Sequence, residues 1–220
     1  MKYWSYAWLL LCSCIFAQSD GQAYPSWFLN PPQANYIIGY SHNYTVPSAS
    51  RDSSLLDAMA IYHLTNGGQI QANTIMFKGR VADSLGLGLK DELEQLELMF
   101  VKEASIQDMY IAQYEYQVVP DSTGERDGTE TSGQRISAVG KQPIRLGKLF
   151  ESWSSAEIEA LKELSRQKGA KVRSIHKEDG SGQQVLIEMR SQTRLYNARI
   201  ERRWVEGNVV HVEVSDIIWK

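Results

Sequence analysis

The chain has 220 residues, of which 43% are hydrophobic and 22% are charged, a composition typical of a globular protein and not of a disordered one. Its 23 basic and 26 acidic residues give a formal net charge of −3. This near balance, without a polybasic tract, argues against a nucleic-acid partner or an anionic lipid surface. The length allows one large domain or two small ones.

Residues 1–17 have the pattern of an export signal. Lys2 supplies the positive charge, and an apolar core runs to Ala17, which is short for a membrane span of about 20 apolar residues. Cleavage after Ala17 would release a soluble periplasmic or secreted protein, whereas Leu11-Cys12-Ser13-Cys14 resembles a lipobox with Cys14 as the lipidated residue. An uncleaved anchor is a third possibility. Both cysteines lie in this segment, so cleavage after Ala17 would leave no disulfide, thiolate metal site or cysteine nucleophile.

Residues 24–32 predict an extended arm stiffened by prolines, with Trp27 and Phe28 docked on the remainder of the protein. A ligand platform built on Trp27 is the alternative. Residues 36–38 predict a short buried strand, and Gly39 permits a close backbone approach. A helix is expected from Ser48 to Leu64, because apolar residues recur there at helical spacing.

The order of these features, a proline-tryptophan arm, Asn-Pro-Pro, an apolar strand ending in Gly and a helix carrying Asp57-Ala58, resembles the Lpp-twenty family of bacterial envelope lipoproteins. That family includes flagellar lipoproteins and assembly factors of the FlgP and FlgT type. The resemblance covers about residues 24–75. It implies an envelope location, a small α+β domain and a mostly non-enzymatic role.

The middle of the chain predicts a strand over 69–81, a flexible connection over 85–89, a helix over 90–102 and a half-buried strand over 110–118. Residues 121–134 contain no apolar side chain, so they predict a solvated loop. Calcium binding by this loop is disfavoured because Ser132 stands where the closing Glu would be needed.

A helix is predicted from Ser155 to Lys168, with Ser154 and Glu157 as a capping box and Ile158, Leu161 and Leu164 buried. Strands follow over 171–176 and 184–190, and a final hairpin over 196–215. A three-residue loop would set Trp204 opposite Val210 and Ile200 opposite Val214. Arg202 would then face the apolar side and would need to snorkel or to find a carboxylate.

These elements predict an α+β fold, with helices packed on mainly antiparallel sheet. The expected divisions are a signal segment (1–17), an N-terminal region (24–119), a polar loop (120–135) and a C-terminal region (136–220). The two regions share a rough order of elements, but no sequence identity marks them as a repeat. One sheet and two sheets both remain open.

We expect no catalytic residue, metal site or cofactor, because the histidines at 42, 63, 176 and 211 are scattered and no hydrolase motif is present. His63 is expected to be structural and His211 solvated. The sequence favours a non-catalytic exported envelope lipoprotein that acts as a structural or assembly factor. Its partners would be envelope proteins or further copies of itself, and its membrane attachment would be the lipid on Cys14. The alternative is a periplasmic hydrolase or small-ligand-binding protein with a cleft between the halves. The predicted contact residues are Trp27, Phe28, Tyr110, Tyr114 and Tyr116.

Overall fold

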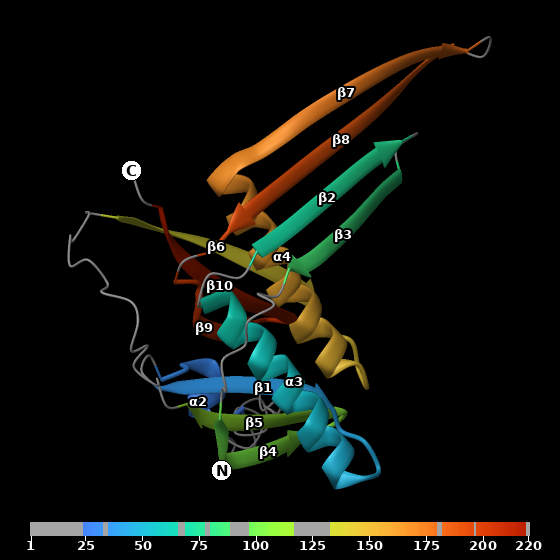
Figure 1. Ribbon diagram of the computed structural model, residues 1–220. Helices are drawn as coiled ribbons and strands as arrows, with labels where there is room; N and C mark the ends of the chain where they lie inside the picture. Colours follow the sequence, from blue (N-terminus) through green and yellow to red (C-terminus); the bar gives the residue numbers. More distant parts are fainter. Residues whose placement is uncertain are drawn as a thin grey trace, which may run out of the picture.

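The structure is a computed structural model that describes residues 24–32, 35–65, 69–77, 80–88, 97–116, 133–179, 182–195 and 197–218. The signal segment with Cys14, and most of the predicted polar loop, lie outside these residues. Within them the chain forms helices and antiparallel sheets, which confirms the α+β prediction (Figure 1).

The N-terminal unit is a three-stranded sheet covered by one helix. Its sheet has the order β1-β5-β4, so β5 lies in the middle and the chain-first strand at one edge. The elements are β1 (Tyr36–His42), α3 (Pro47–Thr65), β4 (Leu98–Ile106) and β5 (Met109–Tyr116).

The C-terminal unit repeats this plan in the same chain order. Its sheet has the order β6-β10-β9, again with the last strand in the middle. The elements are β6 (Gln134–Pro143), α4 (Leu149–Gly169), β9 (Arg199–Glu206) and β10 (Val209–Ile218).

The same glycine contact joins strand to helix in both units. A Cβ placed on Gly39 would lie 1.9 Å from the carbonyl oxygen of Ser54, and one on Gly140 would lie 1.9 Å from that of Ala156. No side chain fits at either distance, so the first strand can approach its helix this closely only at a glycine. The close approach expected at Gly39 is therefore confirmed, and the structure adds its counterpart at Gly140.

The residue after each glycine makes an equivalent hydrogen bond. The amide of Tyr40 donates to Asp57 Oδ2 at 3.0 Å, and the amide of Lys141 donates to Glu159 Oε2 at 3.0 Å. Each acceptor is a carboxylate on the unit's own helix. The pair of contacts thus fixes the helix against the first strand in the same way twice.

The two hairpins also match in detail. Each turns at a residue with positive φ, Gln107 (52°) and Gly207 (58°). Each carries a one-residue bulge in its first strand, at Val101 and at Glu201. The two units are therefore one structural motif used twice, although their sequences show no recognisable identity.

A second hairpin is inserted after the helix of each unit. These two hairpins pair with one another into a four-stranded sheet of order β3-β2-β8-β7, which projects from the body (Figure 1). Its strands are β2 (Gln69–Phe77), β3 (Arg80–Gly88), β7 (Ala170–Asp179) and β8 (Gly182–Arg194). The sheet links the two units because β2 and β8 come from different halves of the chain.

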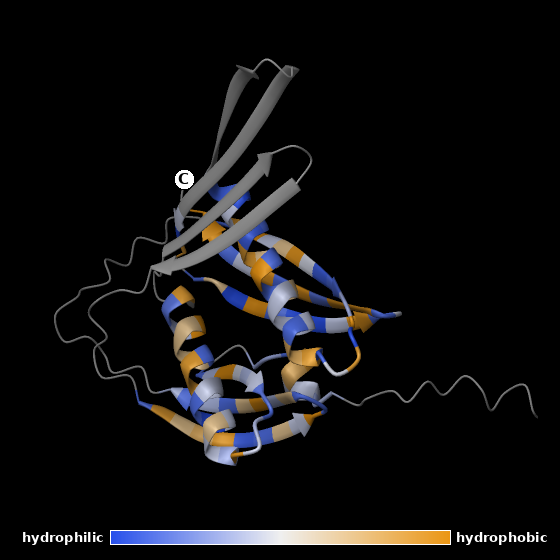
Figure 2. Ribbon diagram, turned by 90° about the vertical axis from the view of Figure 1, so that its right-hand side faces the viewer, coloured by the Kyte–Doolittle hydropathy of each residue, from blue (hydrophilic) through white to orange (hydrophobic). Residues whose placement is uncertain are grey.

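The core continues from one unit into the other. On one face of the N-terminal sheet, Tyr110, Ala112 and Tyr114 pack with residues of α3. On its other face, Met109 and Ile111 join the main core, which includes α4 and the valines of β10. Strand β5 is thus buried on both faces, whereas the alternating sequence predicted a half-buried strand. In Figure 2, other strands of the body alternate orange and blue along their length.

Three predictions for the middle of the chain need correction. The single strand predicted over 69–81 is divided between β2, which ends at Phe77, and β3, which begins at Arg80, and the predicted flexible connection at 85–89 lies in β3 as far as Gly88. The helix predicted over 90–102 is wrong from Leu98 onward, where β4 begins. Pairing with β5 outweighs the helical spacing of the apolar residues there.

Helix α4 begins six residues earlier than predicted, at Leu149. Ser154 therefore lies inside the helix and does not cap it; instead the first amide of the helix, from Leu149, donates to Asp108 Oδ1 at 2.8 Å, in the turn of the other unit's hairpin. Trp153 is fully buried inside the helix, whereas Ile158 is 38% exposed. The predicted buried positions Leu161 and Leu164 are correct.

The N-terminal arm is not fully extended. Residues Ser26–Leu29 form a single helical turn, α2, which places Phe28 in the core against Trp153 with ring centroids 5.2 Å apart. The predicted docking of the arm is correct for Phe28, which is 0% exposed.

Candidate functional site at the seam between the units

The predicted contact residues divide into buried and accessible ones. Phe28, Tyr110 and Tyr114 are at most 5% exposed, which removes them from any contact surface. Because β5 is the central strand, it has no free edge. Trp27 and Tyr116 are partly exposed, so only these two remain candidates.

The seam between the units is organised around Arg203, which is 1% exposed. Its guanidinium donates to Glu157 Oε2 at 3.2 Å and to the carbonyl oxygen of Phe28 at 3.2 Å. The same group lies 4.6 Å from the Phe28 ring centroid and 5.6 Å from that of Tyr40. Arg203 therefore connects β9 to α4, to the N-terminal arm and to β1.

Tyr40 and Asp57 complete this polar cluster from the N-terminal unit. The Tyr40 hydroxyl donates to Glu157 Oε2 at 3.0 Å, across the seam. Burial, and then the nearby Glu157 charge, raise the pKa of Asp57 to about 8. Burial and the same glutamate hold the pKa of Tyr40 well above its usual value. The raised pKa favours the protonated form of Asp57, and Glu157 is the acid that contacts the Arg203 guanidinium directly.

This seam cluster (Tyr40, Asp57, Glu157 and Arg203) is an ion pair held among aromatic rings, with a neutral acid beside it. A buried ion pair contributes little net stability, but removing one partner leaves an uncompensated charge. The arrangement therefore fixes how the two units are joined. The Nε atom of Arg203 is buried and has no hydrogen-bond partner among the described residues.

A register that turns Arg202 toward the apolar side turns its neighbour Arg203 toward solvent, and the structure corrects this, because Arg203 is buried. The turn has two residues, which pairs Trp204 with His211, and the bulge at Glu201 then restores the predicted pairing of Ile200 with Val214. Downstream of the bulge the two faces are exchanged, so Arg203 enters the core.

Two nearby residues, Arg202 and His211, also lie on the opposite face of the sheet from the one predicted. Arg202 lies on the surface, where its Nε donates to Glu213 Oε2 at 2.7 Å, and His211 is 5% exposed beneath Trp204 with ring centroids 4.8 Å apart. The partner carboxylate required for Arg202 is present, but on the solvated face. His211 is not solvated as predicted. The conflict at Arg202 was the one sequence signal that indicated a bulge.

Two adjoining cavities lie along the seam. The larger has a volume of about 120 Å³, and the smaller, of about 10 Å³, shares Ile61, Arg199 and Ile200 with it. Ile61 belongs to α3 and the other two residues to the C-terminal unit, so both halves of the chain line these spaces.

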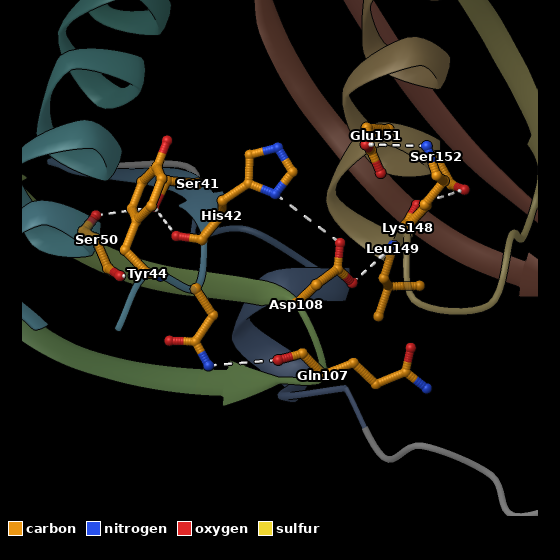
Figure 3. Close-up of polar contacts among 11 residues, drawn as sticks. Ser41, His42, Tyr44, Ser50, Gln107, Asp108, Lys148, Leu149, Glu151 and Ser152 are labelled. Atoms are coloured by element: carbon orange, nitrogen blue, oxygen red, sulfur yellow. Dashed lines mark hydrogen bonds and ion pairs between the residues drawn. The ribbon is translucent and has the colours of Figure 1, made fainter. Parts of the chain in front are cut away.

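A second set of polar contacts joins the units at the start of α4 (Figure 3). Asp108 lies in the turn between β4 and β5, and its Oδ1 accepts a hydrogen bond from the amide of Leu149. Its other carboxylate oxygen, Oδ2, lies 4.0 Å from His42 Nδ1. The His42 ring lies against Phe150 with centroids 4.1 Å apart. One aspartate of the first unit thus caps the helix of the second.

The histidines considered as ligands do not converge within the described part of the chain. His63 is 5% exposed, burial lowers its pKa, and its Nε2 has no hydrogen-bond partner among the described residues. The side chain of His176 lies outside the described residues. Among the side chains that the structure does describe, no three His, Cys, Asp or Glu residues group as a metal site would require.

No described helix combines the length and apolar character needed to span a membrane. No family model, curated protein or solved structure matches the chain.

Proposed function

We propose that the chain is a non-catalytic exported protein of the cell envelope, a lipoprotein anchored through Cys14 that acts as a structural or assembly factor through contacts with envelope proteins or with itself. The observation that supports this best is the double unit. Two copies of one motif are fixed to one another by the seam cluster, by the Asp108 cap and by the joint four-stranded sheet. Such a body presents surfaces in a defined relative position, which is what an assembly factor requires.

The accessible surface that suits a protein partner lies on β4, not on β5. Strand β4 is an edge strand, and its successive residues Met99, Phe100 and Val101 are each 43% exposed. Lys102 Nζ lies 5.1 Å from the Trp27 ring, so the arm adjoins this strand. Exposed apolar residues on a sheet edge are uncommon in proteins that function alone. We therefore assign partner contact to the β4 edge patch (Trp27, Met99, Phe100 and Val101).

The location is tested by the intact mass of the protein from membrane and soluble fractions of its own cells. A lipid adduct on Cys14 in the membrane fraction is expected. A chain beginning at Gln18 in the soluble fraction would refute the anchor, and a cytoplasmic chain that retains Met1 would refute export.

The contact role is tested with Met99→Lys and Val101→Lys in the full chain. Both variants should melt like the parent, because the side chains are half-exposed, yet lose co-purification with the envelope fraction's partner complex. Leu146→Lys is the matched control, since Leu146 is 91% exposed and lies in the turn before α4. Unchanged complex size for both β4 variants would contradict the proposed contact surface.

A further inference from the structure

Four connections of the body meet at one end of the molecule, the loop end (residues 43–46, 107–108, 144–148 and 207–208). Two of them converge on Asp108, whose carbonyl oxygen accepts the amide of Asn43 at 2.7 Å and whose Oδ1 accepts the amide of Leu149 at 2.8 Å (Figure 3). The turn of the second hairpin joins them, because the carbonyl oxygen of Asn208 accepts the amide of Ile144 at 2.9 Å. Helices α3 and α4 both begin at the loop end, and the strands of the projecting sheet follow from their other ends.

The loop end exposes apolar residues at equivalent places in the two units. Val46, in the loop before α3, is 58% exposed, and Leu146, in the loop before α4, is 91% exposed. The two loops are neighbours, because the His42 ring lies 6.0 Å from the ring of Tyr44 and 4.1 Å from that of Phe150. Tyr44 is itself 46% exposed. Apolar side chains that protrude from adjacent loops mark a surface that meets an apolar partner.

Exposed cations stand beside the most exposed of these residues. Arg145 directly precedes Leu146, and Lys148 follows two residues later with a side chain that is 59% exposed. Their charge is partly offset, since Lys148 Nζ lies 3.7 Å from Glu151 Oε1 and the side chain of Glu206, beside the second hairpin turn, is 78% exposed. An apolar tip between two cations suits the membrane interface, where phosphate groups lie above the acyl chains.

The length of the N-terminal tether indicates which end of the body lies nearest a bilayer. Ten residues lead from Cys14 to Tyr24, and a chain of that length spans at most roughly 35 Å. Tyr24 packs on Trp153, in the first turns of α4, with ring centroids 5.4 Å apart. The tether therefore meets the body close to the loop end. Helix α4 has 21 residues and is about 32 Å long, so placing its far end on the lipid would use nearly the whole reach of the tether.

We propose that the loop end is the membrane-facing surface of the anchored protein, with Leu146 and Val46 inserted into the lipid interface and Arg145 and Lys148 at the phosphate groups. This inference rests on the lipid anchor proposed above. The chain is nearly neutral, so its charge does not draw it to lipid, and the contact orients a protein that the anchor holds in place. The four-stranded sheet then begins at the far ends of the helices, about a helix length from the bilayer (Figure 1).

The test uses the lipidated protein in vesicles of phosphatidylethanolamine and phosphatidylglycerol. Cys12 lies in the cleaved segment and the thiol of Cys14 carries the lipid, so a cysteine introduced on the body is the one free thiol of the mature chain. Leu146→Cys and, separately, Val46→Cys are labelled with a fluorophore that responds to polarity, nitrobenzoxadiazole. On vesicles, the emission of both labels should shift to shorter wavelength and lose its quenching by iodide.

Glu163→Cys is the matched control. Its side chain is 45% exposed, and it lies about 20 Å along α4 from Leu149, so iodide should still quench its label on vesicles. All three replaced side chains are exposed, so the variants should fold like the parent.

The outcomes separate the membrane contact from the anchor. Protein that floats with the vesicles but is quenched by iodide as strongly at positions 146 and 46 as at 163 would overturn the contact and leave the anchor standing. Shielding that is absent in lipid vesicles but present in native envelope membranes would assign the loop end to a protein partner and would also overturn it. Protein that does not float with the vesicles would refute the anchor, and the membrane contact with it.

Discussion

The two units place residues of opposite charge at one structural position. Glu103 pairs with Ala112 of β5 as Arg203 pairs with Val212 of β10, and each reaches toward its own unit's helix. Glu103 is 44% exposed and bonds Arg51 at 3.0 Å, with the Tyr110 hydroxyl as a second partner, whereas Arg203 is buried among aromatic rings.

The helices explain this difference. Helix α3 covers one face of the first sheet and has solvent on its other side, as the 67% exposure of Leu56 shows. Helix α4 lies between its own sheet and the first unit, so its neighbours share one core with the first unit. A repeated backbone therefore does not fix the energetics of a position, because the layer that covers the position decides whether its charge is buried.

The largest expected difference in the free energy of unfolding is between variants of the equivalent residues Arg203 and Glu103. Arg203→Met should lower the free energy of unfolding by about 3–5 kcal/mol, because it leaves the Glu157 charge buried without its partner. Glu103→Gln should cost far less, since an exposed ion pair contributes little. Urea denaturation followed by circular dichroism measures both. Similar losses of stability in the two variants would contradict the proposed difference in burial. Adding Glu157→Gln to Arg203→Met should recover part of the stability lost in Arg203→Met.

The paired glycines should instead behave alike. Gly39→Ala and Gly140→Ala should each cost about 2–3 kcal/mol, because the new methyl group would overlap a helix carbonyl. Gly147→Ala is the control for glycine replacement without a clash. Gly147 has a φ of 68° and open space around its Cβ position, so backbone strain alone should cost about 1 kcal/mol. Chemical denaturation of the three variants checks this, and a cost at only one of the paired sites would break the equivalence of the units.

The buried carboxyl of Asp57 should make the stability of the protein depend on pH. The pKa of Asp57 is raised to about 8, so the folded state holds a proton that the unfolded state releases above about pH 4. Stability from this group is therefore complete below about pH 4 and is lost as pH rises toward 8.

Asp57→Asn should remove this loss, because the asparagine side chain does not ionise. Its amide oxygen can still accept the hydrogen bond from the Tyr40 amide. The variant should be more stable than the parent at pH 8, and the difference should vanish near pH 4. Glu159→Gln, at the exposed equivalent bond to Lys141, is the matched control for placing an amide at this position of a helix. Thermal melts between pH 4 and 8 measure the profiles; an Asp57→Asn profile as steep as the parent's would contradict the assignment.

The smallest contrast is expected at the two hairpin turns. Asp108→Ala should cost about 1 kcal/mol, since it removes the cap of α4. The equivalent Asn208 donates through Nδ2 to the Ile144 carbonyl at 3.3 Å in an exposed setting, so Asn208→Ala should cost only a few tenths of a kcal/mol. Melting temperatures distinguish the two, and equal shifts would show that Asp108 does not act as a cap.

The local sequence pattern was sufficient to predict those elements whose structure depends mainly on their own residues. The helix expected over Ser48–Leu64 matches α3 (Pro47–Thr65), and the strand at 36–38 and the close approach at Gly39 are both present. The helix predicted over 98–102 is wrong because the apolar spacing there suits a helix, whereas pairing with β5, which is distant in sequence from any local signal, makes these residues a strand.

For this protein, the amino-acid sequence by itself determined the α+β class, the first helix and the strands of the last hairpin, because periodicity and turn residues act over a few positions. Only the tertiary structure decided the bulge at Glu201, the burial of both faces of β5 and the structural equivalence of the two units. A one-residue bulge exchanges every side chain beyond it between the two faces. Which face is covered depends on a layer from the other half of the chain, so the inward position of Arg203 could not be derived from its neighbours in sequence.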